Sequence, residues 1–285
     1  MISFVILHYQ AVDETISCIE TIIEKVSGNK KVIVVDNGSP NGTGELLQEK
    51  YKGFDCVCVV STKKNLGFAK GNNIGFQEAK KDNPDFIVVM NNDVFLKQDD
   101  FTDRVYAAYN NSKFDILGPD IFSTKVNDHQ NPQREQNYTL EELKATQRKL
   151  RFKDSYKWML RIKYLFPLSV EKPSIKEHYT KERKIGVVLH GACYIFSKSF
   201  IERHNECFYG KTFMYYESYI LHYLAQMENL RMVYEPAIQV LHHEDVATNL
   251  SYTSRYSKSV FVNKCLLDSC EAFIEVMQNR TKMIG

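Results

Sequence analysis

The sequence lacks the features that would mark a membrane-spanning, secreted or nucleic-acid-binding protein. No run approaches the ~18 apolar residues of a membrane span, and the apolar N-terminus has neither a basic leader nor a small-residue cleavage site. The seven cysteines contain no CxxC pair, which favours reduced thiols in a cytosolic protein over disulfides or a zinc site. A formal net charge of +2 is too small to indicate nucleic-acid binding.

The composition is that of an ordinary globular chain. Its 285 residues are 44% hydrophobic and 25% charged, enough to bury a sizeable core in one large domain or a domain with an appendage. A phosphate-binding loop of the GxxxxGK[ST] type is absent. The polar turn from Asn65 to Asn73, with glycines at 67 and 71, could instead bring backbone close to a nucleotide.

Apolar strand patterns alternate with helical periodicity through the first third of the chain. We predict strands at residues 2–8, 31–36, 55–61 and 85–90, separated by helices at 12–26, 43–52 and 68–81. This alternation predicts an α/β fold with a parallel sheet and right-handed crossovers. Further along we predict helices at 99–111, 198–204, 219–227 and 254–280 and strands at 115–119, 185–195, 231–235 and 238–242, the second of them interrupted at 190–192. The polar segment 123–138 is predicted to be a long loop, which in a compact domain is often functional.

Two of the predicted strands end in polar residues. Asp36 follows an apolar run, and Asn91, Asn92 and Asp93 follow another. Parallel sheets place ligand sites at the carboxyl ends of their strands. Asp93 could cap the next helix, pair with a lysine, or bind Mg²⁺ or Mn²⁺. Asp36 could form a turn before Asn37, or accept a hydrogen bond from a ribose hydroxyl or a nucleobase N–H.

A basic segment interrupts the second half. A helix is predicted to begin at Thr139, and residues 144–184 interleave lysine and arginine with apolar and aromatic residues, including the single tryptophan. A helix of this kind can lie on an anionic membrane surface. The alternative is an appendage whose apolar face packs on the body of the protein.

The order of these motifs closely resembles family 2 of the inverting nucleotide-sugar glycosyltransferases, in particular its rhamnosyltransferase-like members. Later segments fit as well, namely 191–193, 213–217 and 236–243, so the resemblance covers roughly residues 1–245. It implies a GT-A fold with a Rossmann-like, mostly parallel central sheet flanked by helices, a helical insertion and a C-terminal helix. The implied parts are a nucleotide-sugar-binding half at 1–122, an acceptor-binding half at 123–253 with the basic insertion at about 139–184, and a helix at 254–285.

The resemblance also assigns residues to the site. It implies that Asp93 and His242, or the neighbouring His243, hold Mg²⁺ or Mn²⁺. The family motif is often DxD, whereas this chain has Asn91-Asn92-Asp93 and so a single carboxylate. Residues implied to bind the nucleotide sugar are His8, Tyr9, Asp36, Asn37, Asn65, Gly67, Lys70, Asn72, Asn91, Asn92, Gly191 and Ala192.

Inverting transfer needs a base that deprotonates the acceptor hydroxyl. Many relatives carry Glu-Asp, with the aspartate often assigned as the base, but this chain has Glu217-Ser218. A serine cannot serve as that base at neutral pH, so Glu217 is the expected catalytic residue. Asp120 or Asp128 could serve instead, or the protein could have little activity.

The expected function is transfer of a sugar from a nucleotide diphosphate sugar, dTDP-rhamnose or a UDP-sugar, to a saccharide or lipid-linked acceptor in surface or capsular polysaccharide synthesis. The expected location is cytoplasmic, with contact to the inner face of an anionic membrane, and the apolar 254–280 helix could serve a homodimer. One alternative is a catalytically impaired nucleotide-sugar-binding or assembly module of the same fold. A nucleotidyltransferase is disfavoured, because residues 9–13 lack the glycine- and lysine/arginine-rich loop that such enzymes usually place after their first strand.

Overall fold

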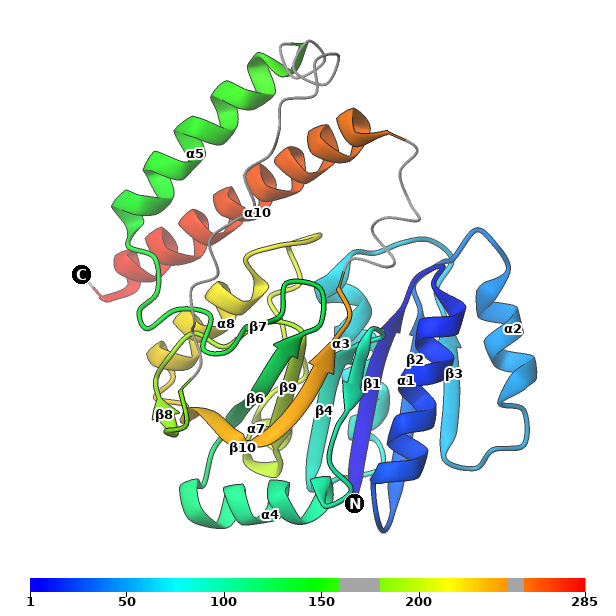
Figure 1. The fold of residues 1–285 in the computed structure, drawn as a ribbon. Helices are drawn as coiled ribbons and strands as arrows, with labels where there is room; N and C mark the ends of the chain where they lie inside the picture. Colours follow the sequence, from blue (N-terminus) through cyan, green and yellow to red (C-terminus); the bar gives the residue numbers. More distant parts are fainter. Residues whose placement is uncertain (159–179, 245–253, 285) are drawn as a thin grey trace.

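The computed structural model describes residues 1–158, 180–244 and 254–284. Within these residues one ten-stranded sheet forms the centre of the molecule, and helices cover both of its faces (Figure 1). The strands are β1 (Ile2–His8), β2 (Lys30–Asp36), β3 (Val57–Ser61), β4 (Phe86–Asn91), β5 (Val94–Leu96), β6 (Ile116–Ser123), β7 (Asp128–His129), β8 (Lys184–Ile185), β9 (Cys193–Ser197) and β10 (Met232–His242). The helices are α1 (Val12–Lys25), α2 (Thr43–Lys50), α3 (Phe68–Lys80), α4 (Phe101–Ser112), α5 (Leu140–Ser155), α7 (Lys198–Arg203), α8 (Glu217–Met227) and α10 (Arg255–Ile284).

The first four long strands form the predicted parallel half of the sheet. Their order is β3-β2-β1-β4, and every pair is parallel. The register aligns His8 with Asp36 and Leu7 with Asn91. The two strand ends that carry the predicted acids therefore lie at the same edge of the sheet, on either side of β1.

The second half of the sheet is mixed. Strand β9 runs antiparallel between β4 and β6, whereas β6 and β10 are parallel to each other. On the main path, β1, β2, β3, β4, β6 and β10 thus point one way and β5 and β9 point the other. The expected GT-A arrangement with a mostly parallel sheet is confirmed.

Two predicted strand boundaries were wrong. The stretches 231–235 and 238–242 are one strand, β10, whose register shifts between Glu235 and Gln239. Pro236 lies in this shift, where its missing N–H costs no ladder hydrogen bond. The interruption predicted at 190–192 is longer than expected: residues 186–192 lie between two separate strands, β8 and β9.

Each face of the sheet has its own apolar core. One face packs against α1, α2 and α4 and the other against α3, α7 and α8. Helix α3 approaches closely because Gly75 has no side chain: a Cβ there would lie 2.3 Å from Cγ1 of Val5. The next residue, Phe76, is fully buried. Truncating such a side chain to alanine lowers the free energy of unfolding by about 3–5 kcal/mol.

Helices α5 and α10 lie side by side at one end of the molecule (Figure 1). Helix α5 begins at a capping box formed by Thr139 and Glu142, as the sequence indicated. Its buried residues Leu143 and Leu150 pack with Phe273 of α10 and Ile220 of α8. The apolar face predicted to serve a dimer is therefore used within the chain. Residues 159–179 of the predicted basic insertion lie outside the described residues.

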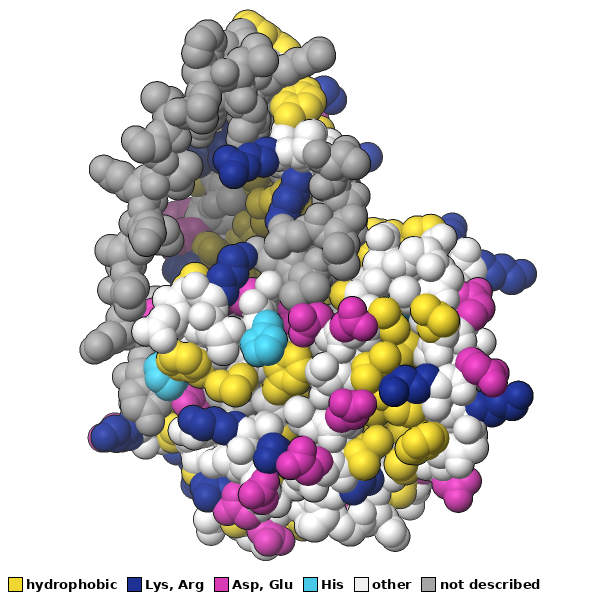
Figure 2. Space-filling view, turned by 45° about the vertical axis from the view of Figure 1, so that its right-hand side comes forward, with side chains coloured by type: hydrophobic (Ala, Val, Ile, Leu, Met, Phe, Trp, Pro, Cys, Tyr) yellow, Lys and Arg dark blue, Asp and Glu magenta, His cyan; other side chains and the backbone are white. Residues whose placement is uncertain are grey.

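The surface supports the interpretation of the net charge. On the side of the molecule that Figure 2 shows, acidic and basic side chains are interspersed, and neither sign forms a continuous patch. No described helix is long and apolar enough to cross a bilayer. The division of the chain at 122 and 253 stays a prediction.

Candidate active site

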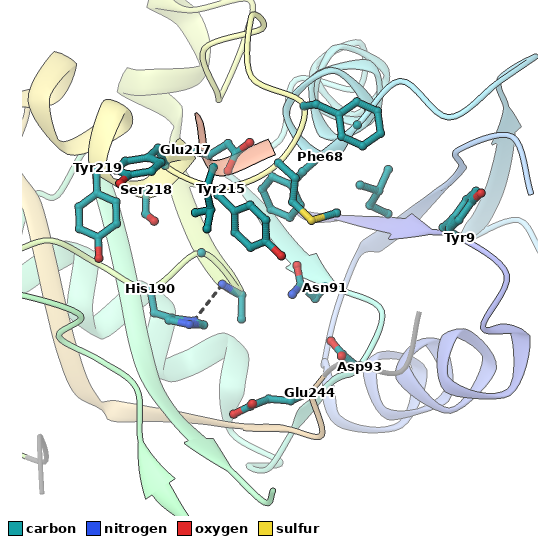
Figure 3. Close-up of a pocket in the computed structure, with 18 of the residues that line it drawn as sticks. Tyr9, Phe68, Asn91, Asp93, His190, Tyr215, Glu217, Ser218, Tyr219 and Glu244 are labelled. Carbon is teal, nitrogen blue, oxygen red and sulfur yellow. Dashed lines mark hydrogen bonds between the residues drawn. The ribbon is translucent and has the colours of Figure 1, made fainter. Parts of the chain in front are cut away.

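A cavity of about 800 Å³ opens at the carboxyl ends of the parallel strands (Figure 3). Its walls come from the ends of β1, β2 and β4, the start of α3, the segment before β9, the start of α8 and the end of β10. The predicted site residues that line it are Tyr9, Asn37, Asn65, Gly67, Asn91, Asn92, Asp93, Gly191, Ala192, Glu217 and His242. The fold thus brings together residues more than 200 positions apart in the sequence.

A polar turn forms one wall. The side-chain amide of Asn37 donates to Oδ1 of Asn65 at 3.1 Å and to the Gly67 carbonyl at 3.2 Å. Its oxygen accepts from the backbone N–H of Leu66 at 2.9 Å. Gly67 has φ +84°, and a Cβ there would lie 2.4 Å from the Phe213 carbonyl oxygen. These bonds hold the turn against the end of β2.

Four predicted nucleotide-binding residues lie outside the cavity lining. His8 is buried, and its ring nitrogens lie 2.7 Å from Oγ1 of Thr15 and 2.9 Å from Oγ1 of Thr43. Burial lowers the pKa of His8 to about 4, so the ring is neutral at physiological pH. Both ring nitrogens of His8 are engaged by threonine hydroxyls, so neither is free to bind a nucleotide.

The remaining three have local roles. Asp36 accepts from the Ser39 backbone N–H at 3.1 Å, which is the turn-forming alternative considered from the sequence. Asn72 is buried and donates to the Phe68 carbonyl at 3.0 Å, and Lys70 is exposed on α3. Contact between these residues and a nucleotide stays a prediction.

Asp93 and His242 meet at one corner of the cavity. Strand β5 follows Asp93 directly and pairs with β10, with Val94 opposite His242, and this pairing brings the two side chains together. Oδ1 of Asp93 lies 3.3 Å from Nε2 of His242. That separation is within ion-pair range, yet Oδ1 makes no hydrogen bond with the described residues. Both side chains are buried.

The hydrogen bonds around His242 show which ring nitrogen carries a proton. The Gln130 amide nitrogen donates to Oε1 of Glu244 at 2.6 Å, so its oxygen faces the ring. That oxygen lies 2.7 Å from Nδ1 of His242, and an amide oxygen can only accept. Nδ1 therefore carries the proton, and in the neutral ring Nε2 presents a lone pair to the Asp93 carboxylate.

Two facing lone pairs fit a cation. A carboxylate oxygen and an imidazole nitrogen are both ligands for divalent metals. No group of three or more metal-binding side chains exists among the described residues, so further ligands would be substrate phosphate oxygens and water. His243, the alternative, stacks on Phe95 with ring centroids 4.3 Å apart and has Nδ1 3.6 Å from Glu14. His242 is the histidine that faces Asp93.

Glu217 lies across the cavity, at the start of α8. The two residues before it, Tyr215 and Tyr216, have φ of +74° and +65°, a strained conformation for residues with large side chains. Glu217 is only 6% exposed, and its Oε1 has no hydrogen-bond partner in the described part of the chain. Burial raises the pKa of Glu217 to about 8, although hydrogen bonds from its own backbone and from Thr212 oppose the shift.

The two alternative bases do not reach the cavity. Asp120 is buried behind it, with Oδ1 2.6 Å from Nδ1 of His129. Asp128 accepts from the His129 backbone N–H in β7. Neither residue lines the cavity wall, whereas Glu217 does.

Sequence reasoning missed several lining residues. Gln130 and Gln133 come from the 123–138 loop, from which only Asp128 was considered, as an alternative base. His190 appeared only as an interruption in a strand pattern. Other polar lining residues that were not assigned to the site are Tyr138, Tyr215, Tyr216, Ser218, Tyr219 and Glu244. They come from loops and helix ends, where no periodic pattern exists.

Solved structures define the class of this fold and site. The structure resembles S. aureus TarS 1–349 in complex with UDP, with a TM-score of 0.55 and 12% identity over 98% of this chain and 71% of that chain. It also resembles GalNAc-T7 with UDP, GalNAc and Mn²⁺, with a TM-score of 0.57 and 12% identity over 86% of this chain and 44% of that chain. In a second structure, of TarS 1–349, the match has a TM-score of 0.54 and 13% identity and covers 85% of this chain and 60% of that chain's length. The fold is that of the GT-A glycosyltransferases.

The sequence comparison gives the family. The model of Glycosyl transferase family 2 matches residues 3–171, and the chain belongs to this family. A curated relative is the low-salt glycan biosynthesis hexosyltransferase Agl10 of Haloferax volcanii, 24% identical over 254 residues, which are 86% of this chain and 68% of that protein. Family and relative support a role in glycosyl transfer.

Proposed function

We propose that this chain transfers a sugar from a nucleotide diphosphate sugar to a hydroxyl acceptor, with inversion at the anomeric carbon. The observation that carries this is the placement in one cavity of two buried carboxylate oxygens, Oδ1 of Asp93 and Oε1 of Glu217, that accept no hydrogen bond from the described residues. Leaving such groups without a partner is unfavourable unless a ligand completes them. A donor between them would have its diphosphate at Asp93 and its anomeric carbon towards Glu217.

Asp93 and His242 would hold the metal, Mg²⁺ or Mn²⁺. The ion would neutralise negative charge that develops on the departing diphosphate. The chain supplies one carboxylate and one imidazole, and Gln130 orients the imidazole through Nδ1. With a single acid at the corner, we expect modest metal affinity.

Glu217 would act as the base. Its carboxylate takes the proton from the acceptor hydroxyl while that oxygen forms a bond to the anomeric carbon, and the bond from this carbon to the diphosphate oxygen breaks. The nucleoside diphosphate leaves with the bonding electrons. A carboxyl group with a pKa of about 8 loses its proton near physiological pH and is a stronger base than an exposed glutamate.

The classes of donor and acceptor are inferred from the resemblance and from the relatives. Resemblance favours dTDP-rhamnose or a UDP-sugar, and both cited structural relatives contain UDP. A saccharide or lipid-linked saccharide acceptor in surface or capsular polysaccharide synthesis is consistent with the relative in glycan biosynthesis. Tyr138, Tyr215 and Tyr219 line the cavity, and aromatic side chains of this kind would contact an acceptor sugar.

A ligand panel tests the function. We expect UDP or dTDP, with Mn²⁺, to raise the melting temperature, and one of their sugar nucleotides to be hydrolysed slowly in the absence of an acceptor. The released sugar should have the opposite anomeric configuration to the donor. Binding without any hydrolysis would instead favour the impaired binding module, for which Ser218, in place of the usual aspartate, is the supporting observation. No binding to any nucleotide would exclude both readings.

We further propose that the end of α5 contacts the inner face of an anionic membrane. Phe152 and Trp158 are 61% and 58% exposed, among several lysines of the same segment. Aromatic and cationic side chains together favour the interface of anionic lipid. Replacing Phe152, Tyr156 and Trp158 by serine should reduce flotation with phosphatidylserine vesicles. Phe54→Ser, which removes a 50% exposed aromatic side chain elsewhere, is the control, and equal flotation of both variants would contradict the proposal.

A further inference from the structure

His190 occupies the cavity wall between the metal corner and the base. Its ring centroid lies 5.9 Å from that of His242. On the other side, a Cβ on the next residue, Gly191, would lie 3.9 Å from Oγ of Ser218. In the view of Figure 3 the ring lies below Ser218 and Tyr219 and on the same level as Asn91 and Asp93. The segment 190–192 therefore connects the two ends of the site.

Hydrogen bonds fix the position of this residue. The His190 backbone N–H donates to Oδ1 of Asn131 at 2.7 Å, and the Asn131 amide donates to the Pro119 carbonyl, also at 2.7 Å. Asn131 is fully buried. The Asn91 backbone N–H donates to the Ala192 carbonyl at 2.9 Å. His190 is thus attached to β6 on one side and to the metal-corner strand on the other.

The same network defines the tautomer of the ring. The Ala192 backbone N–H lies 3.3 Å from Nδ1 of His190, the contact drawn in Figure 3. A backbone N–H can only donate, so Nδ1 accepts and the neutral ring carries its proton on Nε2. Nε2 makes no hydrogen bond within the described residues. A donor group is therefore oriented at the cavity wall without an acceptor among the residues that the structure describes.

A metal does not account for this nitrogen. Nε2 carries a proton in the tautomer that Ala192 imposes, and a protonated nitrogen has no lone pair for a cation. His190 also forms no metal-binding group of three with Asp93 and His242 in the described part of the chain. The expected partner is an oxygen acceptor on a ligand.

We infer that His190 determines donor-sugar specificity: its Nε2–H donates a hydrogen bond to a hydroxyl of the sugar being transferred. The inference rests on the proposed function, because a sugar joined to a diphosphate at Asp93 and facing Glu217 must lie along the 190–192 wall. In the proposed arrangement the nucleoside lies beyond the diphosphate and the acceptor lies beside Glu217, so neither of them would take that position. His190 would then select among donors that share one nucleotide and differ in their sugar.

The test separates sugar from nucleotide binding. His190→Phe removes the donor and keeps a planar ring, and His190→Gln keeps an N–H donor of similar reach. His204→Phe is a control, since His204 stacks on Phe200 outside the cavity. Titrations would use UDP or dTDP alone, the sugar nucleotide that the wild type hydrolyses, and its monodeoxy analogues, each with Mn²⁺.

For His190→Phe we expect unchanged affinity for the nucleoside diphosphate and about a 10-fold loss in kcat/KM for donor hydrolysis, the size of one unmade hydrogen bond. His190→Gln should recover part of this loss. One deoxy donor should react poorly with the wild type and equally poorly with His190→Phe, which identifies the hydroxyl.

An equal loss for nucleoside diphosphate and sugar nucleotide would overturn the inference, because it would mean a phosphate contact or a structural role. Unchanged kinetics in His190→Phe would overturn it as well, while leaving glycosyl transfer intact. A wild-type protein that binds no nucleotide would instead refute the proposed function and this inference together.

Discussion

Two sets of polar groups line the same cavity and differ in how they are satisfied. Asn37 and Asn65 direct their amides at each other and at the backbone of the 65–67 turn. Oδ1 of Asp93 and Oε1 of Glu217, by contrast, are buried and accept no hydrogen bond from the described residues. The hydrogen bonds of the first set hold the 65–67 turn in place, whereas the oxygens of the second set can still accept hydrogen bonds from a ligand or bind a metal. The contrast separates residues that build the site from residues that react in it.

The largest effect should come from Glu217→Gln. The amide keeps the volume and removes the base, so transfer should fall by about 10²–10⁴-fold, while nucleoside diphosphate affinity stays the same. Turnover and titration calorimetry measure the two quantities. Glu202→Gln, on the exposed face of α7, is the matched control. Unchanged turnover in Glu217→Gln would remove this residue from the role of base.

The second effect concerns pH. Since Glu217 must be ionised to accept a proton, kcat/KM of the wild type should fall about tenfold for each pH unit below its pKa, which burial raises to about 8.

Stability should show the opposite trend. The folded-state pKa lies above the ordinary value of 4.5, so the stabilising contribution is complete below pH 4.5 and is lost as pH rises through about 8. The melting temperature of the wild type should therefore fall relative to Glu217→Gln between pH 5 and pH 9. A constant difference between the two melting curves would show that Glu217 titrates normally.

A smaller effect is expected for Asp93→Asn. Loss of the carboxylate should weaken Mn²⁺-dependent binding of UDP or dTDP about 10-fold and make the remaining affinity insensitive to EDTA. In the absence of ligand the variant should be no less stable than the wild type, because an amide N–H can donate to Nε2 of His242. Nucleotide affinity that ignores both the substitution and EDTA would contradict the metal site.

Substitutions in the 65–67 turn should lower the free energy of unfolding more than they change the rate of transfer. Gly67→Ala places a Cβ 2.4 Å from the Phe213 carbonyl oxygen at φ +84°, whereas Gly53→Ala has a similar φ of +87° and no atom within 4 Å. Both variants carry backbone strain of about 1–3 kcal/mol, and only Gly67→Ala adds the clash. Denaturant unfolding should rank Gly67→Ala below Gly53→Ala, and equal losses would show that the loop at 213 simply moves away.

Much of the donor half could be predicted from sequence. The apolar runs before Asp36 and Asn91 end at the predicted positions, and parallel pairing places these ends at one edge of the sheet. The order of short motifs was enough to indicate the family, which the comparison confirms. Rhamnose specificity and the roles of individual residues stay predictions.

The remaining half could not be derived in this way. His242 reaches Asp93 only because β5 pairs with β10, which places Val94 opposite His242, 148 positions away in the sequence. Gln130 and His190 come from segments without periodicity, and a one-residue change in the β10 register would have turned His242 to the other face. A local sequence pattern cannot predict such a long-range strand pairing.

The sequence by itself determined the alternation of strands and helices, the polar strand ends and the glutamate at position 217, because these depend on local periodicity and residue chemistry. Tertiary structure decided which of them meet. It places Asp93 beside His242 rather than His243, and it buries Glu217, which raises the pKa of this residue. It also leads Asp36 to accept a hydrogen bond from Ser39 in the turn after β2, and it orients the protonated nitrogen of His190 at the cavity wall. The physical reason is that burial and long-range pairing, which set the energy of a charged or hydrogen-bonding group, exist only in the folded chain.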